Sequence, residues 1–190
     1  MANKSTNNAK NISVGKPMAG GAVWFAPAGT VAPTDATTAL GAEFESAGYI
    51  SEDGVTNAIE TDSEEIKAWG GDVVMTPQTS RSEKFTMTFI EGNEVTYGVV
   101  FGKENVKTTA DGGFTIVHNG KEREERVMVV ETVLTGNKVK RQVIPRAKVT
   151  EIGEITYVDN EPISYETTIS ALLDDSDNTA YEYIAAIVNE

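Results

Sequence analysis

The 190-residue sequence contains no cysteine, a single histidine and few aromatic residues, which make up 7% of the chain. Without cysteine it has no disulfide scaffold, no thiolate nucleophile, no zinc ribbon and no iron–sulfur cluster. One histidine is too few for a multi-histidine metal site. The length suits one domain, or one domain with long arms.

Basic residues are also scarce, because 16 Lys and Arg stand against 29 Asp and Glu, a formal net charge of −13. Proteins that grip nucleic acid need clustered Lys and Arg to displace counterions from phosphates, so this balance excludes that class. It leaves room for a protein that works beside DNA without holding it. Residues 35–65 and 151–190 are acidic without one basic residue, whereas residues 103–148 carry ten basic and six acidic residues. Such segregation is typical of solvated faces, and it also suits subunits that stack basic surface on acidic surface.

Long apolar runs are missing as well. Runs such as residues 127–130 are strand-sized, far short of the roughly 20 residues that a membrane span needs. Residues 1–8 are mostly polar, so we expect no secretory signal and no membrane partner, and synthesis in a cytoplasm.

Most of the chain alternates between apolar and polar residues with the period of β-strands. Turn residues separate the segments: residues 51–54 predict a tight turn, residues 69–72 a Gly-Gly hairpin, and Pro145 a break or an edge. Residues 181–188 are ambiguous between strand and helix, and we expect both tryptophans in the core. The predicted strands are 22–25, 58–66, 73–75, 81–90, 114–117, 126–134, 139–144, 149–158 and 163–173.

One segment predicts a helix. Asn93 is suited to cap it and Gly102 to end it, and Tyr97, Val100 and Phe101 fall on one face that we expect to pack on the sheet. The alternating segments around it are typical of antiparallel strands with one apolar face. The sequence therefore predicts a mainly β fold: an antiparallel β-sandwich or partly closed barrel with one flanking α-helix.

The expected organisation is a flexible N-terminal arm over residues 1–18 and a single β domain over residues 19–190. Within that domain, residues 26–48 are dominated by Ala, Pro, Gly and Thr and predict a long loop. Loops of that length are usually functional or disordered.

None of the polar clusters forms a recognisable catalytic, cofactor or metal motif. Asp175 and Asp177 lack the remaining residues of a calcium loop, and His118 has no nucleophile motif beside it. Glu60, Asp62 and Glu64 lie on one face of one strand, which does not create the facing pair of carboxylates that glycosidases use. Three neighbouring acids repel one another, so they are best placed facing bulk water or a wide aqueous lumen.

Several short segments, in this order and spacing, resemble the major tail proteins of long-tailed bacteriophages of Gram-positive hosts. The resemblance spans about residues 20–175, and no single piece is as specific as a metal or nucleotide motif. The segments are VWFAPAGT at 23–30, PTD at 33–35, GYISEDGV at 48–55, IKAWGGDVV at 66–74, PRAKV at 145–149, GE at 153–154 and ISYETTI at 163–169.

The resemblance implies a tail tube protein of the virion, made in the host cytoplasm and without catalytic residues. Its copies would form hexameric rings around an inner β-barrel, and the rings would stack into a tube. The tube would bound the tape measure protein, meet tail terminator and distal tail proteins at its ends, and conduct DNA during ejection. The long loop and the N-terminal arm would contact neighbouring rings.

Two groups of residues follow from this expectation. An acidic lumen would repel phosphate, and its candidates are Glu60, Asp62, Glu64 and Glu166. The candidates for the ring-stacking loop are Trp24, Pro27, Pro33 and Asp35. We expect residues 1–18 and 26–48 to become ordered only when rings stack.

Two other classes of function stay open from the sequence. One is an acidic β-sandwich that binds a partner, such as a virion decoration or host-surface adhesion domain. The other is a small hydrolase with an unrecognised site. The sequence does not identify the phage or its host, or distinguish a free phage from a prophage or a phage-derived particle.

Overall fold

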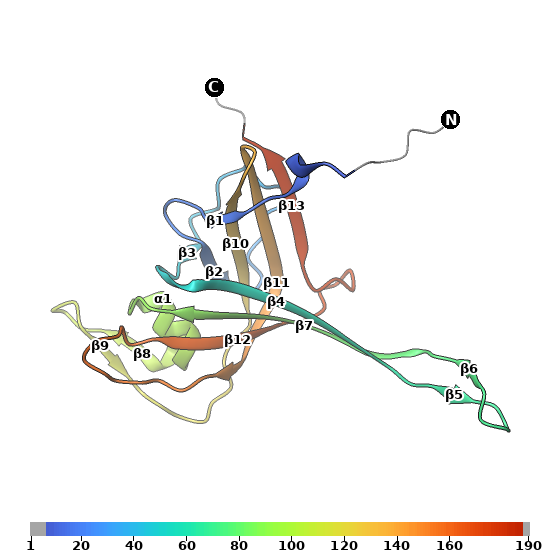
Figure 1. Cartoon of the computed structure of the whole chain (residues 1–190). Helices are drawn as coiled ribbons and strands as arrows, with labels where there is room; N and C mark the ends of the chain where they lie inside the picture. The colour runs from blue at the N-terminus through green and yellow to red at the C-terminus, as the bar shows by residue number, and fades with distance from the viewer. Residues whose placement is uncertain (1–6, 188–190) are drawn as a thin grey trace.

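The computed structural model describes residues 7–187, and nearly all of its regular structure is antiparallel β. The expected fold class is thereby confirmed as a β-sandwich with one α-helix, and the described strands do not close into a barrel. Figure 1 shows the two parts of the sandwich, and a long arm that leaves it on the right. The elements are η1 (Ala9–Asn11), β1 (Gly15–Pro17), β2 (Val23–Pro27), β3 (Glu45–Ser46), β4 (Ile50–Ser63), β5 (Ile66–Lys67), β6 (Val73–Met75), β7 (Gln78–Phe89), α1 (Glu94–Tyr97), η2 (Gly98–Gly102), η3 (Lys103–Asn105), β8 (Val106–Thr108), β9 (Phe114–Ile116), β10 (Arg126–Leu134), β11 (Lys138–Ile152), β12 (Tyr165–Ala171) and β13 (Tyr181–Ala186).

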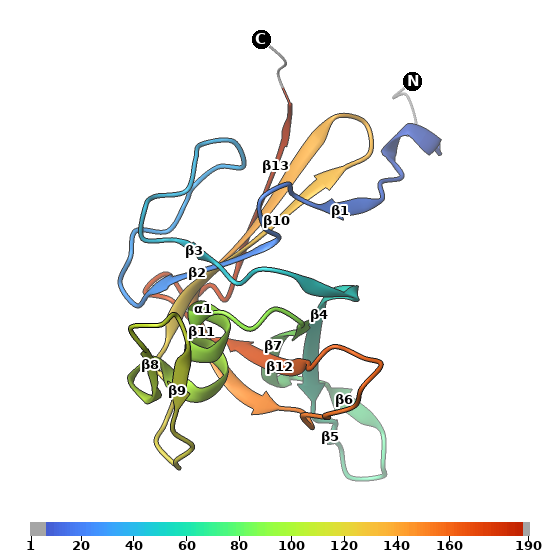
Figure 2. The same ribbon diagram turned by 90° about the vertical axis from the view of Figure 1, so that its left-hand side faces the viewer.

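The main sheet has the strand order β3-β2-β10-β11-β12-β7-β4, with β1 added to β10 and β13 added to β11. The 15-residue strand β11 belongs to both layers, because its first half pairs with β13 and its second half pairs with β12. The upper layer is therefore β3, β2, β10, β11 and β13, and the lower layer is β11, β12, β7 and β4. Figure 2 shows the two layers crossing at a steep angle.

The continuity of β11 corrects the expected break at Pro145. On one edge of β11, pairing with β13 ends at Val143 and pairing with β12 begins at Ala147. On the other edge, the register with β10 shifts at the same level. Proline has no amide hydrogen to donate, so it is tolerated where a strand changes partners. The two strands predicted at 139–144 and 149–158 are one.

Between the layers lies the larger hydrophobic core. Phe25 of β2 faces Phe89 of β7, with ring centroids 6.2 Å apart. Phe85, Met87 and Phe89 alternate with polar residues along β7 and are fully buried, as the period-2 pattern predicted. A second cluster covers the far face of the upper layer, so that residues 127–130 of β10 are buried on both faces.

The predicted helix begins where expected, with the Asn93 side chain accepting a hydrogen bond from the Thr96 amide at 2.9 Å. It is α-helical only over α1 and continues as the π-helix η2, ending at Gly102 with a φ of 94°. Gly98 and the β-branched Val95 and Val99 have low helix propensity, which accounts for the short α-helical part. Val100 is fully buried, and Tyr97 and Phe101 pack edge-on against Tyr165 of β12.

The structure also decides two other features considered in the sequence analysis. Residues 51–54 do not turn the chain but bulge from β4, because Ile50 pairs with Phe89 and Val55 with Met87, and Gly54 takes a φ of 70°. A bulge absorbs extra residues while the strand continues. The ambiguous C-terminal segment is the strand β13, and Val188 lies outside the described residues.

Candidate assembly surfaces

One face of the lower layer consists mainly of hydroxyl and charged side chains. Paired residues of antiparallel strands point to the same face, and the pairings align Thr56 of β4 with Thr86 of β7 and Thr168 of β12. The Thr86 and Thr168 hydroxyls are 3.1 Å apart. On β11, the Thr150 hydroxyl lies 3.2 Å from that of Ser170. Neighbouring hydroxyls therefore bond to one another across the strands and cover the backbone with a polar surface.

Three of the four acidic residues predicted for the lumen share this face. Glu60 and Asp62 lie on β4, and Glu166 on β12 pairs with Thr88 of the same polar row. Glu64 lies beyond the end of β4, past a shift in register, and is not part of the sheet. Lys84, 3.9 Å from Glu60, and Lys148 point to this face as well. Alternation along β7 could have placed Lys84 here, whereas Lys148 was missed because the sequence does not show that β11 continues through Pro145.

The lower layer has two open edges. No described strand pairs with the outer edge of β4, or with the outer edge of β11 beyond Ala147. Successive strands of the layer are antiparallel, so β4 and β11 run in opposite directions. Open edges of this length promote pairing with another chain. The direction of β4 in one copy therefore allows its open edge to pair antiparallel with the open edge of β11 in another copy.

Beyond the sandwich, β4 and β7 continue as a two-stranded arm that ends in the β5–β6 hairpin (Figure 1). Both of its faces are exposed. At its tip, Trp69 is fully exposed, which corrects the expectation that it lies in the core. Four more exposed apolar side chains surround it; with Trp69 they form what we call the arm tip, namely Ile66, Trp69, Val73, Val74 and Met75.

The arm is held at its base by a polar cluster around one buried carboxylate. Glu83 of β7 is only 6% exposed. Its carboxylate accepts hydrogen bonds from Asn57 of β4 at 3.1 Å and from Arg81 at 3.1 Å. It also accepts one from the hydroxyl of Thr179, in the loop before β13. These bonds tie both strands of the arm to the body, so the direction of the arm is set within a single chain.

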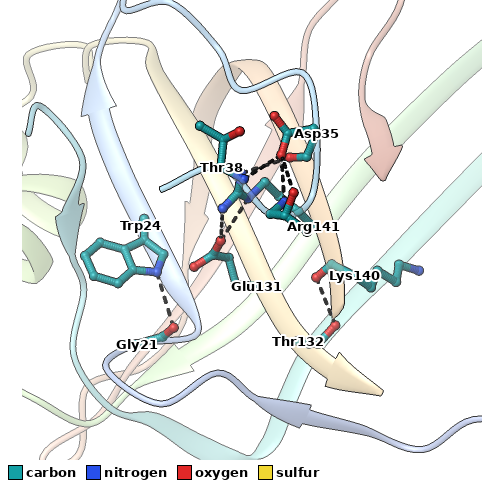
Figure 3. A network of polar contacts seen from close by, with 9 residues as sticks. Gly21, Trp24, Asp35, Thr38, Glu131, Thr132, Lys140 and Arg141 are labelled. Carbon is teal, nitrogen blue, oxygen red and sulfur yellow. Dashed lines mark hydrogen bonds and ion pairs between the residues drawn. The ribbon is translucent and has the colours of Figure 1, made fainter. Parts of the chain in front are cut away.

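The predicted ring-stacking loop is anchored on the upper layer. The buried pair Arg141–Glu131 lies beneath it, with each residue 4% exposed. Arg141 donates to one Glu131 carboxylate oxygen from Nε at 2.8 Å and from Nη2 at 2.5 Å, and from Nη1 to the Asp35 carbonyl at 2.8 Å. Figure 3 shows the guanidinium between Glu131 and the loop. Ala36 and Phe44 of the loop are buried.

Asp35 organises the loop through its own side chain. Its carboxylate accepts hydrogen bonds from the amides of Thr38 at 2.6 Å and Thr37 at 2.7 Å. The Thr38 amide contributes most to holding the pKa of Asp35 well below its ordinary value. Contacts within one chain already hold this segment, which corrects the expectation that residues 26–48 become ordered only when rings stack.

The other residues proposed for that loop differ in position. Trp24 and Pro27 belong to strand β2, and Trp24 is half-buried with its indole N–H donating to the Gly21 carbonyl at 3.2 Å. Pro33 lies in the loop and is half-buried. The N-terminal arm is partly structured, because β1 pairs with β10. Residues 1–6 of that predicted arm lie outside the described residues.

The sequence profile of the phage tail tube protein family matches residues 5–189. The chain belongs to the phage tail tube protein family. This tail tube protein also resembles a solved structure, the tube-terminating cap of the anti-feeding prophage, with 14% identity, a TM-score of 0.46, and coverage of 97% of this chain and 100% of that one. No curated protein matches it significantly.

Membership of this family makes the tail tube protein a structural component of the phage tail and not an enzyme. Within residues 7–187, no three His, Asp or Glu side chains are placed to hold a metal ion. Over the same residues, no helix has both the length and the apolar character that crossing a membrane requires.

Proposed function

We propose that copies of the tail tube protein join through their lower layers into closed rings, and that the polar face lines the channel of the tail tube. The observation that carries this proposal is a four-stranded polar sheet whose two open edges run in opposite directions. Antiparallel pairing of β4 with the β11 edge of the next copy would continue the same ladder around a ring and leave no edge exposed.

The ring size implied by the sequence resemblance is six, so that the inner wall would have 24 strands. At about 4.8 Å per strand, the circumference is about 115 Å and the backbone-to-backbone diameter about 37 Å before strand tilt widens it. Barrels of 16–18 strands already enclose water-filled channels. The channel would therefore be a wide aqueous one, suited to passing a polymer.

The charges on the proposed lining favour DNA that slides without binding. Glu60, Asp62, Glu151 and Glu166 outnumber Lys84 and Lys148 on this face. A small excess of negative charge repels phosphate, and the hydroxyls between the charges offer no cation to hold it. DNA would pass on ejection into the host, and the tape measure protein would occupy the channel before that.

Other expectations from the sequence analysis extend this proposal. Residues 19–190 would act as one tube-forming domain, with residues 1–18 as an arm toward neighbouring copies. Tail terminator and distal tail proteins would bind the two ends of the tube. The particle would be a long-tailed phage of a Gram-positive host, as the sequence resemblance implies.

Single-cysteine labelling tests which face lines the channel, because the natural chain has no cysteine. Glu166→Cys places a thiol on the polar face, and Lys107→Cys places one on β8, an exposed strand that packs against the helical side of the sandwich. We expect a bulky polyethylene glycol maleimide to label both variants as monomers but only Lys107→Cys in assembled tubes. Equal labelling of the two in tubes contradicts the proposed lining.

Electron microscopy of the same preparations tests assembly itself. Concentrated protein is expected to form tubes of uniform width with a regular ring repeat. A species that stays monomeric at all concentrations refutes the proposed function and favours a binding module.

A further inference from the structure

The loop between β9 and β10 contains the single Asn-Gly pair of the sequence, Asn119–Gly120. Glycine allows close approach of its backbone, so the Gly120 amide nitrogen can reach the carbonyl carbon of the Asn119 side chain with no side chain in the way. Figure 2 shows β8 and β9 beside α1. On this helical side of the sandwich, His118 stacks on Phe101 with ring centroids 4.6 Å apart. Both residues of the pair are exposed, so water reaches them.

The side-chain amide of Asn119 is held at both of its polar atoms. Its Oδ1 accepts hydrogen bonds from the Lys121 backbone amide at 3.0 Å and from Nδ2 of Asn105 at 3.4 Å. Its Nδ2 donates to Oδ1 of Asn105 at 2.7 Å. Asn105 is only 8% exposed, and its Nδ2 also donates to the Phe101 carbonyl at 2.8 Å. A buried amide therefore holds an exposed one in a single orientation.

We propose that this arrangement is a self-modification site, at which the folded chain deamidates Asn119. A bond forms between the Gly120 nitrogen and Cγ of Asn119, and the bond from Cγ to Nδ2 breaks. The proton of the Gly120 amide leaves with Nδ2 as ammonia. Water then opens the cyclic succinimide to aspartate or isoaspartate, and water is the only co-reactant. All the groups belong to one chain, so the reaction does not depend on assembly.

Two features of the fold favour the attack on Asn119. Negative charge develops on Oδ1 as the new bond forms, and the Lys121 amide and Asn105 Nδ2 already direct hydrogen-bond donors at that atom. Donors placed in this way stabilise an oxyanion without having to reorganise. The attacking nitrogen is also available, because within residues 7–187 the Gly120 amide donates no hydrogen bond.

The product of the reaction is less able to keep the loop in place. Asn105 donates from Nδ2 to the Phe101 carbonyl and accepts at Oδ1 from Asn119. A carboxylate at position 119 has no hydrogen to donate, so Oδ1 of Asn105 would lose its partner. Turning the Asn105 amide over would instead set its oxygen against the Phe101 carbonyl. Since a buried polar atom without a partner is unfavourable, deamidation would release residues 117–125 from the helical side of the sandwich.

Mass spectrometry of the natural chain measures the reaction. Folded protein and protein unfolded in guanidinium chloride are incubated in parallel at mildly alkaline pH, and peptides are compared over time. The peptide with Asn119 should gain the mass difference between OH and NH2 at least about tenfold faster in the folded sample, because one hydrogen bond to a developing charge is worth about that factor. Asn137, which is exposed and followed by lysine, is the internal control and should keep its amide.

Two variants separate the chemistry from the fold. Gly120→Ala adds a methyl group into open space, since apart from its chain neighbours no atom lies within 4 Å of that position. It should fold normally and lose most of the reaction in both samples. Asn105→Ala removes the buried amide, and its folded rate should fall toward the rate of the unfolded chain. The comparison of folded with unfolded natural chain stands even if Asn105→Ala does not fold.

Trypsin measures the release of the loop. Lys121 and Arg123 are cleavage sites in it, and Nε of Arg123 donates to the Val100 carbonyl at 2.6 Å while the loop is attached. Natural chain that has been aged until Asn119 has reacted should be cut at these sites at least about fivefold faster than fresh chain, because local opening exposes them. Gly120→Ala of the same age should be cut as slowly as fresh chain.

The results separate the two parts of the proposal. A folded chain that deamidates no faster than the unfolded chain overturns the self-modification site. So does a folded Asn105→Ala that reacts as fast as the natural chain. Deamidation at the expected rate without faster cleavage by trypsin overturns the release of the loop.

Discussion

Replacing Arg141 by methionine should strongly destabilise the chain. Arg141 and Glu131 are both almost fully buried, and three hydrogen bonds of 2.5–2.8 Å join the guanidinium to Glu131 and to the Asp35 carbonyl. Methionine has a similar length and no charge. Arg141→Met therefore leaves the Glu131 carboxylate buried without its counter-ion.

The magnitude follows from that uncompensated charge. Removing one partner of a buried ion pair costs about 3–5 kcal/mol of unfolding free energy. For a chain of this size, 1 kcal/mol shifts the melting temperature by about 2–4 °C, so the midpoint should fall by roughly 6–20 °C. The double variant Arg141→Met with Glu131→Leu removes both charges. It should recover most of the loss, apart from about 1 kcal/mol for the hydrogen bond to Asp35.

Urea unfolding of the monomer at low concentration measures both variants against the natural chain. Matched slopes against urea would show that the free energies are comparable. A single variant within about 1 kcal/mol of the natural chain would refute the reasoning, since it would mean that water reaches Glu131. A double variant no better than the single one would show that the loop contact, and not the ion pair, carries the effect.

Three further predictions test other parts of the fold. Asn93→Ala removes the cap of α1 and should cost about 1 kcal/mol of unfolding free energy in urea. Asn93→Ser keeps a capping acceptor and should cost less, whereas Asn93→Asp would set a carboxylate against the Ala47 carbonyl and the Glu91 carboxylate, which now accept from the Asn93 amide nitrogen. Phe85→Ala opens a cavity in the fully buried core and should cost about 3–5 kcal/mol by the same assay, while a value near zero would mean that β7 is not buried. Asp35→Asn tests pH dependence. The folded pKa of Asp35 is lowered chiefly by the Thr38 amide, so its stabilising effect is complete above the unfolded value near 3.9 and is lost as the pH falls through the folded pKa. Melting temperatures should therefore differ between Asp35→Asn and the natural chain at pH 6 and converge at the most acidic pH, and a difference that grows with acid would contradict this.

The local features of the fold could be predicted because they depend on neighbours in sequence. The period-2 pattern of β7 determines which of its side chains face the core, and Asn93 caps α1 through a hydrogen bond to an amide three residues away. The polar character of Glu60, Asp62 and Glu166 is likewise readable from alternation within single strands. The family, too, was indicated by the sequence alone, through the order and spacing of the short segments that resemble those of tail proteins.

Other features depend on contacts between residues far apart in sequence, and only the tertiary structure decided them. The strand β11 passes through Pro145 because β13 and β12 share one of its edges, a pairing that no local pattern encodes. Trp69 occupies an apolar setting in the sequence, yet the arm carries it beyond any part of the body that could cover it. Arg141 anchors a loop 106 residues away. Composition and periodicity thus determined the strands and their polar faces, whereas long-range pairing decided which edges are left open for another copy and which tip is exposed.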